Sequence, residues 1–402
     1  MRPRRIAAMP IYLDNAATTP LRRDALDAML PLLGDDFGNP SSVHGFGRRA
    51  RGALDEARER LATGLNAQPR EIIFTAGGTE AINLALKGAA WAGKARGGRL
   101  VTTAVEHHAV LYTLRHLEKF GFELVVVPVD RYGRVDPEQL DAAINDRTIL
   151  VSLMLANNEV GTIQPLPEVI RRIRAHKGIV IHLDAVQAAP YMAIDTRELD
   201  VDMLSLAAHK FEGPKGIGAL YVRHGTIMLP QVHGGSQERY RRAGTENVAG
   251  AVGMAVAYEL TRSEQAVTAP RLAALRDRLR DAVLAVPNVE LTGHPRKRLP
   301  GHLSVIVRDV EGEAVVQNLD LAGVAVSTGS ACTTGSTEPS HVLTALGYPD
   351  EEARGSLRIT LGRANTDHEI EQAGRIIPET ILQTRTAALA IAADPLGEQV
   401  GA

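Results

Sequence analysis

The sequence predicts an α/β protein built on a mostly parallel sheet. From about Leu21 to Leu260, short apolar runs typical of buried strands alternate with segments of helical periodicity. Several of these runs end at polar or glycine-rich residues, and an open α/β sheet binds its ligands at the carboxyl ends of its strands. A second, shorter α/β pattern follows, with strands expected near 303–307 and 356–360.

The length of 402 residues and this change of pattern predict two domains. We expect a large domain at 21–260. A smaller α/β domain would combine residues 1–20 with 261–390 and carry a polar loop at about 327–337. Residues 391–402 are expected to form a flexible tail.

Two residues at predicted strand ends suggest a pyridoxal phosphate (PLP) site. Lys210 follows the strand that runs out through 207–209, and Asp184 ends the strand that begins at Ile179. PLP needs a lysine amine to hold it as a Schiff base, and its ring withdraws electrons when a carboxylate keeps the pyridine nitrogen protonated. Either residue alone is more often a solvated surface charge.

The segment 71–81 has the pattern of a phosphate cradle. An apolar strand breaks at Gly77 and Gly78 and leads into a helix that starts near Thr79. Glycines let the backbone approach an anion, and the N–H groups of a first helical turn point at it. The same residues also occur in ordinary helix capping, so this signal is weak by itself.

Cys332 is the only cysteine, which excludes intrachain disulfides and multi-cysteine metal cages, and we expect no metal site. It lies in a run of small polar residues at 327–336 that favours an exposed loop. A single cysteine is more often a buried structural residue. Its setting here instead suits a nucleophile that reaches a substrate and carries a product away.

With these residues in place, the chain resembles the cysteine desulfurases of the NifS/IscS-like group over nearly its whole length. The resemblance rests on ordered segments at 12–20 (YLDNAATTP), 38–44 (GNPSSVH), 106–110 (EHHAV), 157–161 (NNEVG), 184–187 (DAVQ), 209–210 (HK), 242–245 (RAGT), 329–332 (GSAC) and 357–363 (LRITLGR). It implies a PLP-dependent transferase of fold type I, with a seven-stranded, mostly parallel sheet in the large domain.

The resemblance also implies roles around the cofactor ring. Lys210 would form the Schiff base and shuttle protons, and Asp184 would pair with the pyridinium nitrogen. Gln187 would bond the phenolic oxygen, and Asn158 would face that oxygen or the substrate. His107 would stack on the ring and act as an acid or base, as an imidazole can near neutral pH.

Further roles concern the phosphate and the substrate. The resemblance implies that Gly78, Thr79 and His209 hold the phosphate, and that Thr245 reaches it from the other subunit of a homodimer. Arg358 would bind the substrate carboxylate with its guanidinium fork, and Arg363 is the competing candidate. Asn39 would also contact the substrate.

One position departs from the family pattern. Three residues before the lysine the family often places a serine that bonds the phosphate, and here the residue is Ala207. The loss costs at most roughly 1.5–3 kcal/mol, and Ser205 or backbone N–H groups are the alternatives that would compensate.

Several of these residues have simpler structural explanations. His107 and His108 could begin a helix, and His182 and His302 are expected to be core or strand-end histidines. The 157–161 segment could be only a turn, because Asn and Gly tolerate left-handed conformations. Arg358 could be one polar residue of a half-buried strand.

Composition favours a cytoplasmic enzyme. The net charge of −2 with 23% charged residues provides no basic surface for nucleic acid. No apolar run approaches the roughly 18 residues that span a bilayer, and the basic start lacks the apolar core of a signal peptide.

Three functions compete on this evidence. The first is a cysteine desulfurase that converts L-cysteine to L-alanine and passes sulfur through a Cys332 persulfide to an acceptor, such as an iron–sulfur scaffold, or into other thiolation. The second is a related PLP enzyme, an aminotransferase or selenocysteine lyase. The third is a non-catalytic sulfur-relay subunit. The thiol argues against an aminotransferase, and the combination of Lys210, Asp184 and His107 argues against a relay.

Overall fold

The computed structural model describes residues 10–329 and 339–393. Its contacts divide the chain into two compact units. The large unit comprises Thr18–Asn158 and Thr162–Val267, and the small unit comprises Met1–Ala17, Glu159–Gly161 and Thr268–Ala402. The long helix α7 (Val248–Leu284) runs through the boundary between them.

The large unit is built on a seven-stranded sheet of order β2-β8-β7-β6-β5-β3-β4. Its strands are β2 (Ile72–Thr75), β3 (Arg99–Thr103), β4 (Glu123–Val127), β5 (Thr148–Met154), β6 (Val180–Asp184), β7 (Met203–Ala207) and β8 (Gly218–Val222). Only β8 runs antiparallel to its neighbours. The predicted α/β fold with a mostly parallel sheet is therefore confirmed.

Four helices connect successive strands from β2 to β6, as parallel pairing requires: α3 (Gly78–Gly93), α4 (His108–Glu118), α5 (Pro137–Ala142) and α6 (Leu166–Ala175). Helices α1 (Arg23–Leu33) and α2 (Gly45–Gly64) precede β2, and short 3₁₀ turns occur at η1 (Pro69–Glu71), η2 (Ala208–Lys210) and η3 (Gln237–Tyr240). Among the described residues, no helix is long and apolar enough to cross a membrane.

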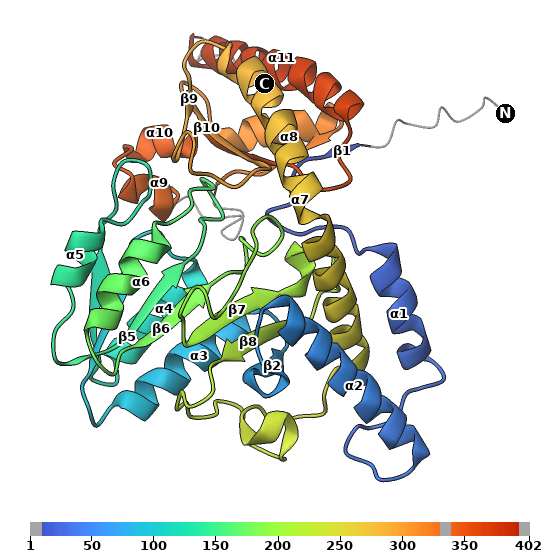
Figure 1. Cartoon of the computed structure of the whole chain (residues 1–402). Coiled ribbons are helices and arrows are strands. Elements are labelled where there is room, and N and C mark those ends of the chain that lie inside the picture. Colours follow the sequence, from blue (N-terminus) through green and yellow to red (C-terminus); the bar gives the residue numbers. More distant parts are fainter. Residues whose placement is uncertain (1–9, 330–338, 394–402) are drawn as a thin grey trace, which may run out of the picture. The chain divides into compact units, whose positions relative to one another are not determined.

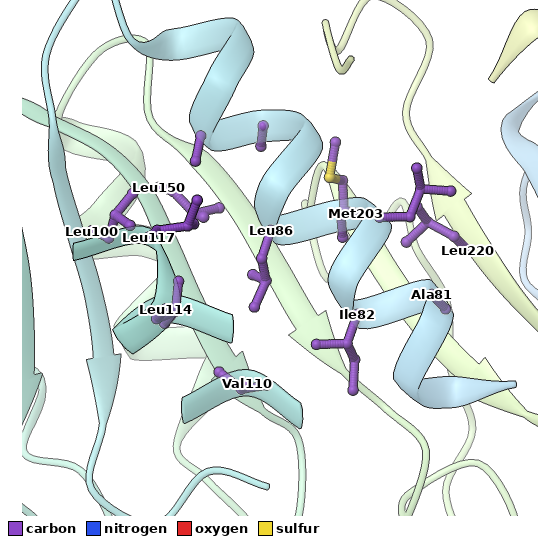
Figure 2. Packing of buried hydrophobic residues seen from close by; sticks show 14 of the residues in the cluster. Ala81, Ile82, Leu86, Leu100, Val110, Leu114, Leu117, Leu150, Met203 and Leu220 are labelled. Carbon is purple, nitrogen blue, oxygen red and sulfur yellow. The ribbon is translucent and has the colours of Figure 1, made fainter. Parts of the chain in front are cut away.

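A core of apolar side chains fixes α3 and α4 against the sheet (Figure 2). Ile82 and Leu86 of α3 and Leu114 of α4 are buried together with strand residues such as Leu150 and Leu220. All seven residues of β5 are buried, as expected for a parallel strand that is covered on both faces. This packing makes the sheet a rigid support for the residues at its edge.

The small unit contains two short sheets. The N-terminal strand β1 (Ile11–Tyr12) pairs in parallel with β11 (Val324–Ala325). An antiparallel sheet has the order β12-β10-β9, formed by β12 (Ser356–Thr360), β10 (His302–Val307) and β9 (Val289–Leu291). Its further helices are α8 (Gly312–Leu321), α9 (His341–Ala345), α10 (Asp350–Arg354) and α11 (Asp367–Ala393), of which α8 and α11 lie side by side (Figure 1).

Strand β12 differs from the sequence prediction. The alternation of polar and apolar residues predicts a half-buried strand, but all five of its residues are buried. Its polar side chains find partners inside the unit. The Arg358 guanidinium, for example, contacts the Asp14 carboxylate at 3.0 Å.

Candidate functional site

The register of the large sheet brings the predicted site residues to one edge. Asp184 is the last residue of β6 and lies opposite Met154 of β5 and Ser205 of β7. Gly218, the first residue of β8, lies opposite both Ala207, which ends β7, and Thr75, which ends β2. The loops that carry Asn158, Lys210 and Gly78 therefore leave the sheet along the same edge.

Two threonines hold the turn that carries Lys210. The Thr19 hydroxyl donates to the His209 carbonyl at 2.8 Å and accepts the Glu212 N–H at 2.8 Å. Thr18 Oγ1 lies 3.2 Å from His209 Nδ1. These contacts fix the backbone on both sides of Lys210, where Glu212 has a φ of 62°. Sequence reasoning did not find Thr18 and Thr19, although both belong to the 12–20 segment of the resemblance.

Asp184 is buried and suited to pair with a cationic ring nitrogen. Its Oδ1 accepts the Val186 N–H at 3.0 Å. Burial raises its pKa to about 6, although the Val186 hydrogen bond and the positive charge of Lys210 lower it. The carboxyl group is therefore mostly ionised at neutral pH. A pyridinium nitrogen would stabilise this ionised form further.

Gln187 presents an unsatisfied polar atom. Its side chain is 5% exposed, and within the described part of the chain its Oε1 has no hydrogen-bond partner. A buried amide without a partner costs free energy unless a ligand satisfies it. Because amide oxygen and nitrogen are assigned from their partners, this position can offer a ligand a donor or an acceptor. It fits the predicted role of bonding a phenolic oxygen.

Helix α3 starts at Gly78, where the sequence predicts a phosphate cradle. A Cβ placed on Gly78 would lie 3.0 Å from Val186 Cγ2 and 3.2 Å from Ala207 Cβ, so the helix start lies close against both residues. The first N–H groups of a helix have no carbonyl partner within it and can bind an anion. Thr79 is exposed in this first turn. The arrangement fits the phosphate of PLP.

The structure narrows the two alternatives for the phosphate hydrogen bond that Ala207 cannot make. The Ser205 hydroxyl lies 2.8 Å from His182 Nε2 and is completely buried, so it serves the core. The backbone N–H groups at the start of α3 are the remaining alternative for the missing hydrogen bond.

His107 begins a helix, as its simpler explanation predicts. It is the N-cap of α4, and its Nδ1 accepts the Ala109 N–H at 3.0 Å, so it does begin a helix. A nitrogen that accepts carries no proton, and the neutral ring therefore holds its proton on Nε2. The cap fixes the orientation of a ring that can exchange a proton at Nε2, and stacking on the cofactor stays a prediction.

Burial lowers the pKa of three further histidines, His182, His209 and His302. Burial lowers the pKa of His209 to about 4, and the charges of Lys210 and Lys215 lower it further. Burial lowers the pKa of His182 to about 3, and Ser152 and Ser205 bond its two ring nitrogens. His302 begins β10, is fully buried, and has a pKa well below its ordinary value, chiefly because of burial. His182 and His302 are thus core histidines, as expected.

Glu106 is an acid that sequence reasoning missed. It is completely buried, and its Oε1 accepts the Thr103 hydroxyl at 2.6 Å. Burial raises its pKa to about 8, against hydrogen bonds from Thr103 and the Met154 N–H, and the charge of Asp184 raises it further. At neutral pH it carries a proton beside the site. The only sequence signal was its place directly before His107.

The remaining predicted residues of the large unit lie in turns. Asn158 is half-buried in the turn 157–161, closed by a hydrogen bond from the Asn157 N–H to the Thr162 carbonyl at 2.9 Å. Asn39 is exposed, and its side chain accepts the Ser41 N–H at 2.9 Å. Thr245 is exposed and follows Gly244, which has a φ of 105°. Their contacts with cofactor or substrate stay predictions.

Arg358, Arg363 and Cys332 belong to the small unit. Arg358 is 3% exposed and paired with Asp14, whereas Arg363 is exposed. A buried and paired guanidinium is less available to a substrate, so this difference favours Arg363 as the carboxylate-binding residue. Cys332 lies outside the described residues, as does most of the predicted loop at 327–337.

The burial of Glu106 predicts a stability change with pH in the cofactor-free protein. The folded chain keeps Glu106 protonated up to about pH 8, whereas the unfolded chain releases this proton near 4.5. The stabilising contribution is therefore complete below about pH 4.5 and is lost as the pH rises towards 8. Glutamine has no proton to release. The free energy of unfolding of Glu106→Gln should therefore rise relative to that of wild type by up to ~1.4 kcal/mol per pH unit in this window.

Urea denaturation at about pH 5 and about pH 7.5 measures this difference in the free energy of unfolding. Glu56→Gln is the matched control, since the Glu56 side chain is 71% exposed on α2. If the difference in the free energy of unfolding between Glu106→Gln and wild type is the same at both pH values, the assignment of a buried, protonated acid is contradicted.

Comparisons with known proteins show the family of the chain. Residues 11–373 match the family model described as aminotransferase class-V. The chain is 48% identical over 375 residues to cysteine desulfurase IscS of Methanosarcina thermophila, covering 93% of each protein. It is 49% identical over 377 residues to cysteine desulfurase IscS of Dictyoglomus turgidum, covering 94% of this chain and 95% of the relative.

Solved structures show the same similarity. A NifS-like protein superposes with a TM-score of 0.88 at 38% identity, covering 93% of this chain and 100% of the other. The structure titled "SspA in complex with cysteine" superposes with a TM-score of 0.78 at 35% identity, covering 89% and 100%. The chain therefore belongs to the class-V aminotransferase family and, within it, to the cysteine desulfurases.

Proposed function

We propose that this chain is a PLP-dependent cysteine desulfurase that converts L-cysteine to L-alanine and transfers the sulfur to Cys332. The observation that carries the proposal is the placement of Lys210, in the turn that follows β7, close enough to the buried carboxyl group at the end of the adjacent strand β6 for its positive charge to lower the pKa of Asp184. The names of the relatives support the same activity. The reaction balances. The C–S bond of L-cysteine breaks, an S–S bond forms between the released sulfur and Cys332, and the proton that the Cys332 thiol gives up is balanced by the hydrogen gained at Cβ, which becomes the methyl group of L-alanine.

Each residue of the large unit has a defined task in this proposal. Bound PLP supplies an electron sink that acidifies the Cα proton of the substrate. The Lys210 amine holds the cofactor and moves protons, and the Asp184 carboxylate keeps the ring nitrogen protonated. Gln187 bonds the ring oxygen, while Gly78 and Thr79 hold the phosphate. His107 offers Nε2 for proton exchange near the substrate.

Two substitutions separate cofactor binding from sulfur transfer. Lys210→Ala should lose the borohydride-reducible link between lysine and cofactor. Cys332→Ser should retain the cofactor and still bind L-cysteine, but form no persulfide and little alanine, because a serine hydroxyl is a poor nucleophile towards sulfur. Mass spectrometry of the persulfide and an alanine assay without added thiol measure these outcomes. Because Cys332 is the only cysteine, a persulfide on the protein can form only at this residue.

Full alanine production by Cys332→Ser would contradict the nucleophile assignment and favour a lyase without a protein carrier. The further transfer to an acceptor protein, such as an iron–sulfur scaffold, can be followed with radiolabelled L-cysteine in the same assay. Label that stays on Cys332 in the presence of the scaffold would contradict that acceptor. A cytoplasmic location stays a prediction from composition.

The two candidate arginines can be distinguished by kinetics. We propose that Arg363 binds the substrate carboxylate, because it is exposed whereas Arg358 is buried against Asp14. Arg363→Lys should raise KM for L-cysteine by about tenfold or more, since lysine cannot form the bidentate contact. Arg358→Lys should mainly lower stability by breaking a buried pair. Steady-state kinetics and thermal denaturation of both variants test this, and the reverse pattern would restore Arg358 as the binding residue.

We further propose a homodimer in which Thr245 contacts the phosphate of the partner subunit. The support is the resemblance of segment 242–245 and the exposure of Thr245 in this chain. Thr245→Val should lower the affinity for PLP by about tenfold, the loss of one charge-assisted hydrogen bond. Sedimentation together with cofactor titration provides the measurement, and a fully active monomer would contradict the proposal.

A further inference from the structure

The carboxyl group of Glu159 lies beside both flanks of the segment that carries Cys332. That segment, 330–338, lies outside the described residues, but Gly329 before it and Ser340 after it are placed. The Ser340 hydroxyl donates a hydrogen bond to Glu159 Oε2. A Cβ built on Gly329 would lie 3.1 Å from the same oxygen, so this oxygen is close to the Gly329 backbone. One oxygen atom thus binds one flank and lies next to the other, and all three residues belong to the small unit.

These flanks are themselves tied to regular structure. The Ser340 hydroxyl accepts the Leu343 N–H at 3.2 Å and so caps α9. The Gly329 N–H donates to the Ser356 hydroxyl of β12 at 3.3 Å. The two flanks are thus bonded to the starts of α9 and β12.

Glu159 is held in this place by its own neighbours. Its side chain is buried, and its backbone carbonyl accepts a hydrogen bond from His302 Nε2 at 3.2 Å. Gly161 has a φ of 76°, and a Cβ there would lie 2.7 Å from His302 Cβ. Only glycine therefore lets the turn approach β10 this closely. The Leu299 N–H bonds the Gly161 carbonyl at 2.8 Å.

Folding alone gives no reason for an acid at this position. Burial raises the pKa of Glu159 to about 7, against the Ser340 hydrogen bond and the positive charge of Arg358. An apolar residue would avoid the cost of burying a carboxyl group. The groups that face Glu159 are Ser340 from the start of α9, Arg358 from β12 and His302 from β10, so the acid is embedded in a specific polar cluster.

Glu159 is also joined by one peptide bond to Asn158, which the proposed function places at the cofactor or substrate. We propose that Glu159 is a positioning residue whose carboxyl group holds both ends of the Cys332 segment and ties them to Asn158. This inference rests on the proposed function. It assigns to the 157–161 segment of the resemblance a task in sulfur transfer that is separate from binding the cofactor.

The test compares Glu159→Ala with Glu159→Gln in the PLP-loaded protein. Glutamine keeps the side-chain volume and an acceptor for the Ser340 hydroxyl, whereas alanine removes both. Glu159→Ala should slow persulfide formation on Cys332 by about tenfold or more, the effect of losing one hydrogen bond to a carboxyl group. Glu159→Gln should recover most of the rate. The dissociation constant of L-cysteine, measured by absorption in a Cys332→Ser background, should change by less than about twofold.

A second readout does not depend on activity. Hydrogen exchange at the Gly329 and Leu343 amides should be faster in Glu159→Ala, because the carboxyl group that orders the two flanks is lost and the bonds of these amides to the Ser356 and Ser340 hydroxyls open more often. Ser340→Ala, which removes the donor, should slow sulfur transfer similarly, and the double variant should be no worse than either single variant. Glu313→Ala is the control, since Glu313 is an exposed acid on α8.

The outcomes are separable. If the wild-type protein forms no persulfide, the proposed function fails. If the wild type forms the persulfide and Glu159→Ala forms it at the same rate, the positioning role is overturned. It is also overturned if Glu159→Ala loses affinity for L-cysteine to the same extent as it loses the rate of sulfur transfer. If Glu159→Ala does not fold, Ser340→Ala and Glu159→Gln decide by the same two measurements, and additive effects of the paired variants would also overturn it.

Discussion

The hydrogen-bonded register of β5, β6 and β7 is the constraint on which the site depends. It sets Asp184 opposite Met154 and Ser205, and so fixes where the loops with Asn158 and Lys210 leave the sheet. A slip of one residue would turn Asp184 to the other face of the sheet. The buried strands and the α3–α4 core oppose such a slip, because it would break the close packing of the apolar side chains between these helices and the sheet (Figure 2).

Burial also sets the charge of the groups around this edge. Water is excluded from Glu106, Glu159, His182 and His302, and in each case the pKa moves in the direction that favours the neutral form. Asp184 is subject to the same penalty, but a backbone N–H and the Lys210 charge keep its pKa near 6. It is thus a carboxylate in surroundings that neutralise other acids, which is what a cationic cofactor ring requires.

The sequence predicted what local pattern determines and missed what distant contacts determine. Strand periodicity located Lys210, Asp184 and the start of α3, and it predicted His182 as a core residue. It could not find that Thr19 bonds the His209 carbonyl, 190 positions away, or that Arg358 pairs with Asp14 across 344 positions. Polar alternation in β12 predicted an exposed face, because no single-sequence signal shows that another segment will cover it.

The departure at Ala207 follows from the same close packing. A Cβ on Gly78 would lie 3.2 Å from the Ala207 Cβ, so the start of α3 and the end of β7 approach each other here. In the proposed site the first N–H groups of α3 would bind the phosphate, and backbone donors hold an anion without the entropy cost of ordering a side chain. A hydroxyl at 207 would add one donor to a helix terminus that already has several. The proposed site therefore needs the serine at 207 less than it needs Gly78, whose lack of a side chain permits the approach.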